Sequence, residues 1–328
     1  MSNPYVFIVG CPRSGTTLLQ RIVDAHPQIA IMSESRWIAE WFEERRGLTP
    51  DGTITSEMVS QLFENPRFAR LHIGREKLMA LMRDDDPVSY SSFVTHIFDL
   101  YGRRKGKALV GNKTPAYVRR LDLLHTLWPQ ARFVHIIRDG RSVCLSVANW
   151  PKAFQADKPG SIAAWREDPV STIAVWWELN VRLGRLVGRS LGPGLYYEIP
   201  YESLVSHPQE ECASLCAFLG LTYDDAMLRF HIGKTKSHPG LSAKRAWLPI
   251  TPGLRDWRSQ MPAEEVERFE AAAGDLLDEL GYSRAFPSTR HESLESAARI
   301  RSLVRRDPAW ITLCASRRAA EADEKLEG

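Results

Sequence analysis

Residues 6–27 read VFIVGCPRSGTTLLQRIVDAHP, and this stretch decides the fold. The short apolar run at 7–9 predicts a β-strand, and the apolar spacing that follows Thr17 predicts a helix. Between them, Gly10 and Gly15 are separated by four residues. That spacing is typical of a loop in which backbone N–H groups and a helix N-terminus face an anion such as phosphate. The stretch therefore predicts a strand–loop–helix unit that holds a phosphate group.

The residue after the second glycine distinguishes this loop from that of the nucleoside triphosphatases. Their motif, G-x-x-x-x-G-K-[ST], has a lysine at this position. Here Thr16 follows Gly15, and the only cation in the turn is Arg13. A tight turn without a ligand is the alternative, but two hydroxyls and a cation are an unusual choice for such a turn. We therefore expect the loop to bind phosphate, but not the Mg-bound triphosphate of an NTPase.

The composition is ordinary for a soluble globular protein, with a mild excess of positive charge. The chain has 328 residues, of which 44% are hydrophobic and 25% charged, and its formal net charge is +3. This charge suits an anionic ligand and is too small to indicate a nucleic-acid partner. The five cysteines lack CxxC pairs, so neither a disulfide framework nor a metal site is expected. We expect no signal peptide before the first strand, and no apolar run approaches the roughly 18 residues of a membrane span. A cytoplasmic enzyme is expected.

Strand and helix patterns alternate along the rest of the chain. Further strands are expected at 28–32, 108–110, 132–137 and 195–199. The alternation predicts an α/β fold of the P-loop type, with three layers and a mainly parallel central sheet covered by helices on both faces. Three helix N-termini are expected to be capped by side chains: one by Ser33 or Ser35, one by Thr114 and one by Asp139.

The domain organisation follows from where the strand pattern is interrupted. Residues 1–282 are expected to form one domain, with a helical insertion on the substrate side at about 46–107. Residues 233–260 look loop-like and basic, and residues 283–328 are expected to form a basic helical tail.

Several chemically active side chains follow the predicted strands. In a parallel sheet, ligands bind at the carboxyl ends of the strands, and Lys113, Arg138 and Tyr201 lie at or just past such ends. Arg138 and Ser146 can clamp a second phosphate. Glu34, the first acid after the second strand, can take a proton from a hydroxyl, and Lys113 can stabilise charge on a transferring group. Singly, each has an ordinary alternative: an arginine paired to an acid, a helix-terminal acid and a solvated lysine.

Three motifs together resemble the sulfotransferase family, whose enzymes move the sulfuryl group of 3′-phosphoadenosine-5′-phosphosulfate (PAPS) to an acceptor. They are PRSGTTL after the first strand, R-D-G-R-S-x-x-x-S from Arg138, and YESLVSHP from Tyr201. The resemblance covers about 5–45, 108–150 and 194–282. It is closest to the branch that contains the tyrosylprotein sulfotransferases and many bacterial relatives. There PRSGTTL is followed by DAHP and an acid-Thr/Ser-Arg segment, which corresponds here to residues 34–36.

The resemblance implies a role for each candidate residue. The 5′-phosphosulfate would be bound by Arg13, Ser14, Gly15, Thr16 and Thr17. The 3′-phosphate would be bound by Arg138 and Ser146, and Tyr201 would line the nucleotide site. Glu34 is the implied general base, and Lys113, with Arg13, would stabilise the transition state. The implied co-substrate is PAPS, the product is 3′,5′-ADP, and no metal is expected.

The match is looser in the loop that closes over the nucleotide in this family. Ser242, with Lys244 or Arg245, falls in that loop. A family lysine before a proline is replaced by Thr251-Pro252. A neighbouring basic residue can substitute for it.

The acceptor is expected to bind between residues 36–107 and 150–168. Aromatic side chains there suggest a wall suited to an aryl or apolar alcohol, with burial in the core as the alternative: Trp37, Trp41, Trp150, Phe154 and Trp165. A tyrosylprotein acceptor needs cations for its acidic flanks. Arg36 is such a cation, but Glu40, one turn further along, would repel an acidic peptide. A small molecule, lipid or sugar is therefore expected, with protein tyrosine as the alternative and a homodimer left open.

Two rival functions come from other classes. A P-loop kinase or NTPase predicts Mg²⁺ and the missing loop lysine. A non-catalytic nucleotide-binding protein would keep Arg138 and Ser146, but would need neither the acid at Glu34 nor the cation at Lys113.

Overall fold

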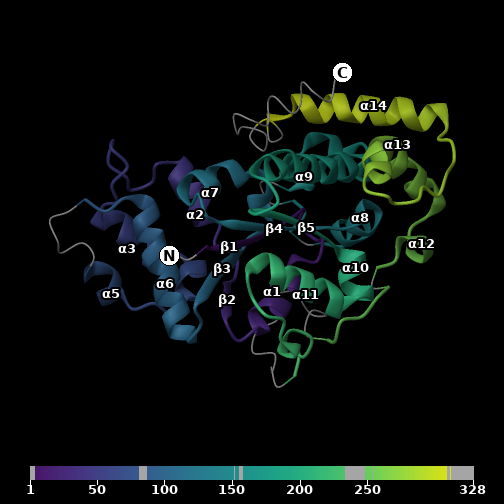
Figure 1. Cartoon of the computed structure of the whole chain (residues 1–328). Helices are drawn as coiled ribbons and strands as arrows, with labels where there is room; N and C mark the ends of the chain where they lie inside the picture. The colour runs from purple at the N-terminus through teal and green to yellow at the C-terminus, as the bar shows by residue number, and fades with distance from the viewer. Residues whose placement is uncertain are drawn as a thin grey trace.

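The computed structural model describes residues 4–80, 87–150, 152–154, 158–232, 248–253, 255–308 and 311. A five-stranded sheet in the order β2-β3-β1-β4-β5 forms the centre, and each neighbouring pair is parallel (Figure 1). The strands are β1 (Val6–Val9), β2 (Ile29–Met32), β3 (Leu109–Lys113), β4 (Arg132–Ile137) and β5 (Tyr196–Pro200). The predicted α/β fold with a parallel sheet is confirmed.

Both faces of the sheet are covered, as the apolar character of its strands requires. All four residues of β1 are buried, which is typical of a central parallel strand. Because side chains alternate along a strand, Phe7 and Val9 enter one apolar core and Val6 and Ile8 enter another.

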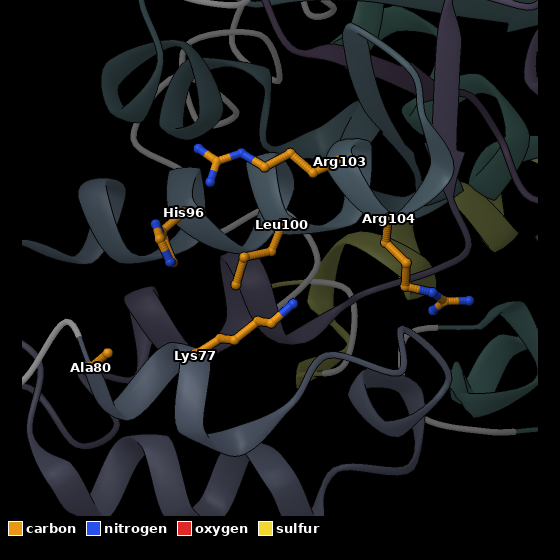
Figure 2. A pocket seen from close by; sticks show the side chains of 6 residues that line it. All are labelled: Lys77, Ala80, His96, Leu100, Arg103 and Arg104. Carbon is orange, nitrogen blue, oxygen red and sulfur yellow. The ribbon is translucent and has the colours of Figure 1, made fainter.

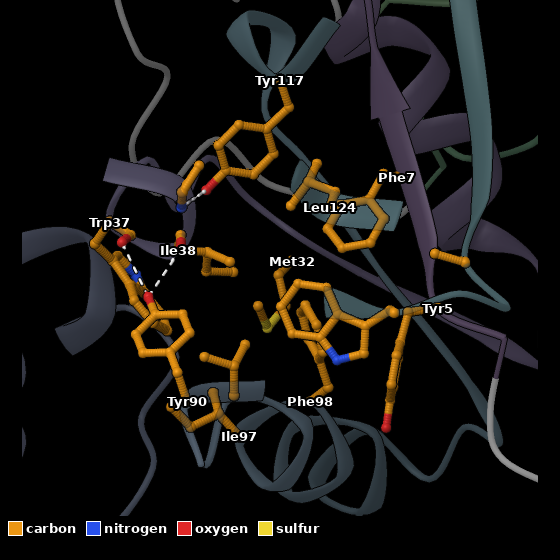
Figure 3. Packing of buried hydrophobic residues seen from close by; sticks show 14 of the residues in the cluster. Tyr5, Phe7, Met32, Trp37, Ile38, Tyr90, Ile97, Phe98, Tyr117 and Leu124 are labelled. Atoms are coloured by element: carbon orange, nitrogen blue, oxygen red, sulfur yellow. Dashed lines mark hydrogen bonds between the residues drawn. The ribbon is translucent and has the colours of Figure 1, made fainter. Parts of the chain in front are cut away.

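Helices from different parts of the chain cover the two faces. The face of Phe7 packs against α2 (Trp37–Glu43), α6 (Tyr90–Lys105), the 3₁₀ helix η2 (Pro115–Arg119) and α7 (Leu121–Leu127). Figure 3 shows this core, in which the Tyr90 hydroxyl donates to the Ile38 carbonyl at 2.8 Å. The face of Val6 packs against α1 (Thr16–Ala25), α10 (Tyr201–Ser206) and α11 (Pro208–Leu219).

A third apolar cluster lies beyond the carboxyl end of β4. It joins α8 (Gly140–Ala148), α9 (Pro169–Leu191), α13 (Ala263–Glu279) and α14 (His291–Arg306). From α14 it takes Ala297, Ile300 and Val304. Short helices complete this region: η3 (Pro159–Ser161), η4 (Ala163–Arg166) and α12 (Trp257–Gln260), whereas η5 (Asp225–Met227) packs against α1 in the cluster of Val6. Among the described residues, no helix combines the length and apolar character needed to cross a membrane.

The segment expected as an insertion is helical. Before α6 it contains α3 (Ser56–Glu64), α4 (Pro66–Ala69) and α5 (Arg75–Met79). In Figure 1, α3 and α5 lie beyond α6, to the left of the sheet. The chain therefore leaves the sheet after β2, runs through this segment and rejoins the sheet at β3.

Two of the predicted helix caps are wrong. α2 has Arg36 at its N-cap and η2 follows Thr114, and neither has a side-chain cap. The Ser35 hydroxyl instead accepts from the Asn112 amide at 2.6 Å, and the Thr114 hydroxyl donates to Asn112 Oδ1 at 2.9 Å. These groups join the ends of β2 and β3, and this contact takes the place of capping. The Asp139 cap is confirmed, because its carboxylate accepts from the Arg141 N–H at 2.9 Å.

Candidate active site

The loop between β1 and α1 is held in a narrow turn. Gly15 has φ of +98°, and a Cβ there would lie 2.5 Å from the Tyr201 ring, so glycine is needed for both conformation and space. Arg13 also has a positive φ, of 82°, which is uncommon for a residue with a side chain. The Ser14 N–H donates to the Cys11 carbonyl at 3.1 Å and closes the turn. The loop therefore presents Arg13 in a fixed orientation.

The helix that follows provides donors for an anion. α1 begins at Thr16 and has no side-chain cap, so the N–H groups of its first turn have no partner within the helix. Such N–H groups and the positive end of the helix dipole favour a bound anion. The Ser14 hydroxyl beside them is buried and has no hydrogen-bond partner in the described part of the chain.

Three arginines gather on one side of this loop. Arg13 Nε donates to Ser146 Oγ at 2.8 Å, and Arg255 Nη1 donates to the same oxygen at 3.0 Å. The Arg138 guanidinium stacks over the Tyr201 ring at 4.2 Å. Burial, and then the positive charges of Arg255 and Arg138, lower the pKa of Arg13 to about 10. Arg138 is buried, Arg13 is half-buried and Arg255 is exposed, and such a concentration of like charge favours binding of an anion.

A carboxylate and a lysine lie on the other side of the loop. Lys113 Nζ donates to Glu34 Oε1 at 3.0 Å and to Thr17 Oγ1 at 3.4 Å, so it connects the carboxylate to the first turn of α1. Arg67 Nη1 donates to Glu34 Oε2 at 3.2 Å. The Lys113 side chain is 5% exposed and that of Glu34 is 41% exposed. The lysine is therefore buried, whereas the carboxylate and the Arg67 side chain, which is 36% exposed, remain open to an incoming molecule.

These cations keep Glu34 ionised. Burial favours the neutral carboxyl, but Lys113, and then Arg67, outweigh it and hold the pKa of Glu34 at about 2, against an ordinary value of 4.5. The side chain is thus a carboxylate throughout the neutral range. It can accept a hydrogen bond from a hydroxyl; a pKa this low makes it a weak base, so proton transfer to it depends on a hydroxyl held within hydrogen-bond distance.

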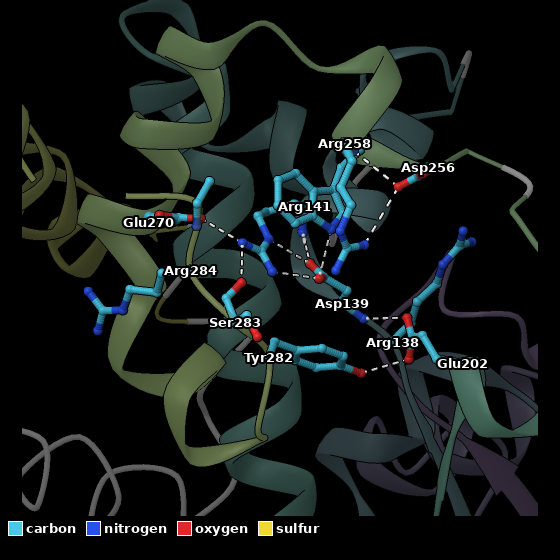
Figure 4. Close-up of polar contacts among 12 residues, drawn as sticks. Arg138, Asp139, Arg141, Glu202, Asp256, Arg258, Glu270, Tyr282, Ser283 and Arg284 are labelled. Atoms are coloured by element: carbon cyan, nitrogen blue, oxygen red, sulfur yellow. Dashed lines mark hydrogen bonds and ion pairs between the residues drawn. The ribbon is translucent and has the colours of Figure 1, made fainter. Parts of the chain in front are cut away.

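A buried polar network supports the arginine side of the site (Figure 4). Arg141 pairs with Asp139 at 2.8 Å and with Glu270 at 2.6 Å. The Trp257 indole N–H donates to Asp139 Oδ2 at 2.9 Å, and the Arg141 guanidinium lies 3.7 Å from the centre of the Trp257 ring. Asp139 directly follows Arg138 in the chain, and Trp257 is two residues beyond Arg255. The network therefore fixes the backbone next to both arginines.

Most of the candidate residues converge at the carboxyl edge of the sheet. Glu34 follows β2, Lys113 ends β3, Arg138 follows β4 and Tyr201 follows β5. Ser146 lies on α8, and its hydroxyl accepts a hydrogen bond from Arg13. Ser242, Lys244 and Arg245 lie outside the described residues.

Sequence reasoning missed two residues of this site. Arg255 belongs to the basic stretch 233–260, but its contact with Ser146 carries no sequence signal of its own. Arg67 lies in the helical insertion, 33 positions from its partner Glu34, and no motif surrounds it. A search for cations at the ends of strands could not have found either one.

The expected aromatic wall is wrong for two of its members. Trp37 and Trp41 are buried in the core on the α6 face of the sheet. Trp150 lies beside Arg13, whose guanidinium is 5.4 Å from the ring centre. Phe154 is exposed and meets Trp165 edge-on at 5.6 Å. Trp150 is therefore on the arginine side of the loop, and both Trp150 and Trp165 pack against the third apolar cluster.

A hollow of about 530 Å³ lies between α5 and α6 (Figure 2). It is lined by Lys77, Ala80, His96, Leu100, Arg103 and Arg104. Arg103 and Arg104 belong to the last turn of α6, where positive charge complements the helix dipole. Arg104 also donates to the Leu71 carbonyl. α6 leads into the amino end of β3, so the hollow lies away from the carboxyl edge that carries the site.

Comparisons with known proteins point to one family. A family model described as "Sulfotransferase family" matches residues 4–225. The chain is 24% identical to protein-tyrosine sulfotransferase A of Caenorhabditis elegans, over 86% of this chain and 68% of the relative. It is 27% identical to nodulation protein NoeE of Sinorhizobium fredii, over 87% of this chain and 67% of the relative.

The fold is also found among solved structures. The sulfotransferase domain from the Synechococcus PCC 7002 olefin synthase matches with a TM-score of 0.55 and 22% sequence identity. The match covers 86% of this chain and 95% of that domain.

Proposed function

The chain belongs to the sulfotransferase family, and we propose that it transfers the sulfuryl group of PAPS in line to an acceptor hydroxyl, with Glu34 as the base. It is a transferase of the EC 2.8.2 type. The observation that carries the proposal is the connection from Glu34 through Lys113 to Thr17. It puts an ionised carboxylate and a cation against a loop that favours an anion.

The residues present suit a ligand with two separate anionic groups. When bound, PAPS supplies an activated sulfuryl group on its 5′-phosphate and a second phosphate at the 3′ position. The loop from Arg13 to Thr17 would hold the 5′ end, where the buried Ser14 hydroxyl has no described partner. Arg138, Ser146 and Arg255 would hold the 3′-phosphate. The Tyr201 ring, which stacks against the Arg138 guanidinium, would line this part of the site. Arg255 is thus a further candidate among the described residues, beside Ser242, Lys244 and Arg245, which lie outside them.

Each side chain has one task in the proposed transfer. Glu34 removes the proton from the acceptor hydroxyl. Lys113, Arg13 and the N–H groups of the first turn of α1 neutralise the negative charge that grows on the leaving oxygen. This is catalysis by positioning and by fixed charges. Because side chains provide the positive charge, the proposal includes no metal ion.

The proposed acceptor is a small molecule, a lipid or a sugar. Arg36, the cation expected to meet an acidic peptide, is paired at 2.8 Å with Glu40 of its own helix. That pair reduces the charge available for the acidic flanks of a tyrosine. Protein tyrosine is the second candidate, because several relatives are named protein-tyrosine sulfotransferases.

Calorimetry and a transfer screen test the proposal. We expect 3′,5′-ADP to bind without Mg²⁺ and ATP to bind much more weakly. Transfer of labelled sulfate from PAPS is then measured across phenols, sterols, sugars and tyrosine peptides. Mg²⁺-dependent ATP binding would favour a kinase or NTPase. Binding of 3′,5′-ADP without any turnover of PAPS would favour a non-catalytic binding protein.

A cytoplasmic location is part of the same proposal. The four described cysteines are free and buried, which suits a reducing compartment. Fractionation of cells that produce the full chain tests this, and recovery with secreted or membrane fractions would contradict it.

A further inference from the structure

Arg67 reaches the proposed base from the helical insertion. Its Nη1 donates to Glu34 Oε2 at 3.2 Å, while Lys113 from β3 donates to the other oxygen, Oε1, at 3.0 Å. The carboxylate is therefore held by one cation on each oxygen, and the two cations come from different parts of the fold.

The short helix that carries Arg67 is firmly anchored. The Asn65 side chain caps α4 and accepts from the N–H groups of Arg67 at 2.9 Å and Phe68 at 3.3 Å. Phe68 is buried and packs edge-on against Trp37, with ring centres 6.0 Å apart. Trp37 begins α2, three residues after Glu34. One aromatic contact thus joins the two segments that carry the ion pair, which fixes Arg67 relative to Glu34.

The arrangement leaves the carboxylate able to react. An ionised carboxylate has about four lone-pair positions, and Lys113 and Arg67 each occupy one. A hydroxyl can therefore approach while both cations stay in place. With both oxygens held, the carboxylate cannot rotate freely about its terminal bond.

We propose that Arg67 is a positioning residue, which fixes the Glu34 carboxylate against Lys113 so that the acceptor hydroxyl meets the base in one orientation. This inference rests on the proposed function. It also gives the insertion a role in turnover besides covering the sheet edge. Orientation of this kind matters because misplacement of a reacting group by about 1 Å can cost about 10²-fold in rate.

The charges around Glu34 give the inference a specific signature. The charged groups that act on it are Lys113 from β3, Arg67 from α4 and, from the loop, Arg13, where the charge of Glu34 opposes the lowering of the Arg13 pKa. Burial raises the pKa of Glu34, and without Arg67 fewer cations lower it, so the carboxyl protonates at higher pH. A side chain that only stabilised the fold would not move the titration of Glu34.

The kinetic test compares Arg67→Gln, Arg67→Lys and the control Arg70→Gln. Arg70 ends the same helix, is exposed, and makes no described contact with Glu34. For Arg67→Gln we expect kcat to fall about 10- to 100-fold with KM for PAPS unchanged. The acid limb of kcat/KM should move up by on the order of one pH unit. Arg67→Lys should keep most of the wild-type kcat and most of the wild-type acid limb. Arg70→Gln should behave as wild type.

A second measurement does not depend on turnover. Infrared or ¹³C NMR titration follows the Glu34 carboxyl, with Glu34→Gln to assign its signal, and calorimetry follows 3′,5′-ADP. We expect the carboxyl of Arg67→Gln to protonate at higher pH than that of wild type, with 3′,5′-ADP affinity unchanged. An unchanged titration and acid limb would overturn the inference, even if kcat fell. Wild-type protein that neither binds 3′,5′-ADP nor uses PAPS would instead overturn the proposed function. The titration of Glu34 remains measurable in that case, so the two failures can be told apart.

Discussion

Glu34 receives a cationic donor on each of its carboxylate oxygens, and these contacts decide its chemistry. The carboxylate is ionised at neutral pH because Lys113 and Arg67 outweigh the effect of burial. Lys113 is almost fully buried, so Glu34 is also the counter-charge that this lysine needs inside the protein. One residue thus serves both the proposed proton transfer and the local charge balance.

Replacement of Glu34 by glutamine separates base chemistry from nucleotide binding. Glutamine keeps the size of the side chain but cannot accept the proton. We expect sulfuryl transfer from PAPS to fall about 10²- to 10⁴-fold, while calorimetry shows unchanged 3′,5′-ADP affinity. Glu40→Gln, which removes an acid one turn along α2 and breaks only the pair with Arg36, is the control. Near-wild-type turnover in Glu34→Gln would show that the base is another group.

The same residue predicts how stability depends on pH. The pKa of Glu34 is about 2 in the folded chain and 4.5 in its ordinary state, so above pH 4.5 the ionised pair stabilises the fold. As the pH falls from 4.5 towards 2, the unfolded chain takes up the proton first and this stabilisation is lost. The difference in Tm between wild type and Glu34→Gln should therefore be largest near neutral pH and shrink below pH 4.5. A difference that stays constant down to pH 3 would contradict the assignment.

At the scale of elements, the helical insertion contributes Arg67 to the site at the carboxyl edge of the sheet. α4 has only four residues, so its position depends on the Asn65 cap and the buried Phe68 ring rather than on helix length. Because Arg67 lies between these two anchors, a loose cap also loosens the ion pair with Glu34. The insertion thus contributes a functional side chain through a very small element.

Removal of the α4 cap tests this dependence. Asn65→Ala deletes the acceptor for the N–H groups of Arg67 and Phe68, and we expect it to lower the free energy of unfolding by about 1 kcal/mol. Asn65→Asp keeps a side-chain acceptor and should cost much less. Urea unfolding of the full chain measures both. Equal stability of the two variants would mean that the cap does not hold α4.

The elements also mark where sequence reasoning succeeds and where it stops. Residues that follow apolar strands were located correctly, because parallel strands all end at one edge and a strand pattern is local. Arg67 and Arg255 were missed because their contacts depend on how distant segments pack. Trp37 and Trp41 were assigned to the acceptor wall because an aromatic on a helix has the same local signature whether it faces a cavity or the core.

At the scale of the whole molecule, one buried network ties the arginine side of the site to the C-terminal helices. Arg141 of α8 is fully buried and pairs with Asp139 and with Glu270 of α13. It also donates to the Ser283 carbonyl at 3.0 Å. Trp257 of α12 lies against it, close to Arg255. The residues proposed to hold the 3′-phosphate therefore depend on helices that follow the sheet in the chain.

Replacement of Arg141 by methionine tests that dependence. The variant leaves two buried carboxylates without their cation, and breaking a buried ion pair from one side costs about 3–5 kcal/mol. We expect a loss of this size in urea unfolding, and weaker 3′,5′-ADP binding by the folded fraction because Trp257 loses its support beside Arg255. Arg46→Met, which breaks an exposed pair with Glu44, should cost about 1 kcal/mol or less.

Adding Glu270→Gln to Arg141→Met removes one orphaned charge, so the double variant should lose less than the sum of the single losses. If Arg141→Met costs no more than the exposed control, the network does not connect the site to the C-terminal helices.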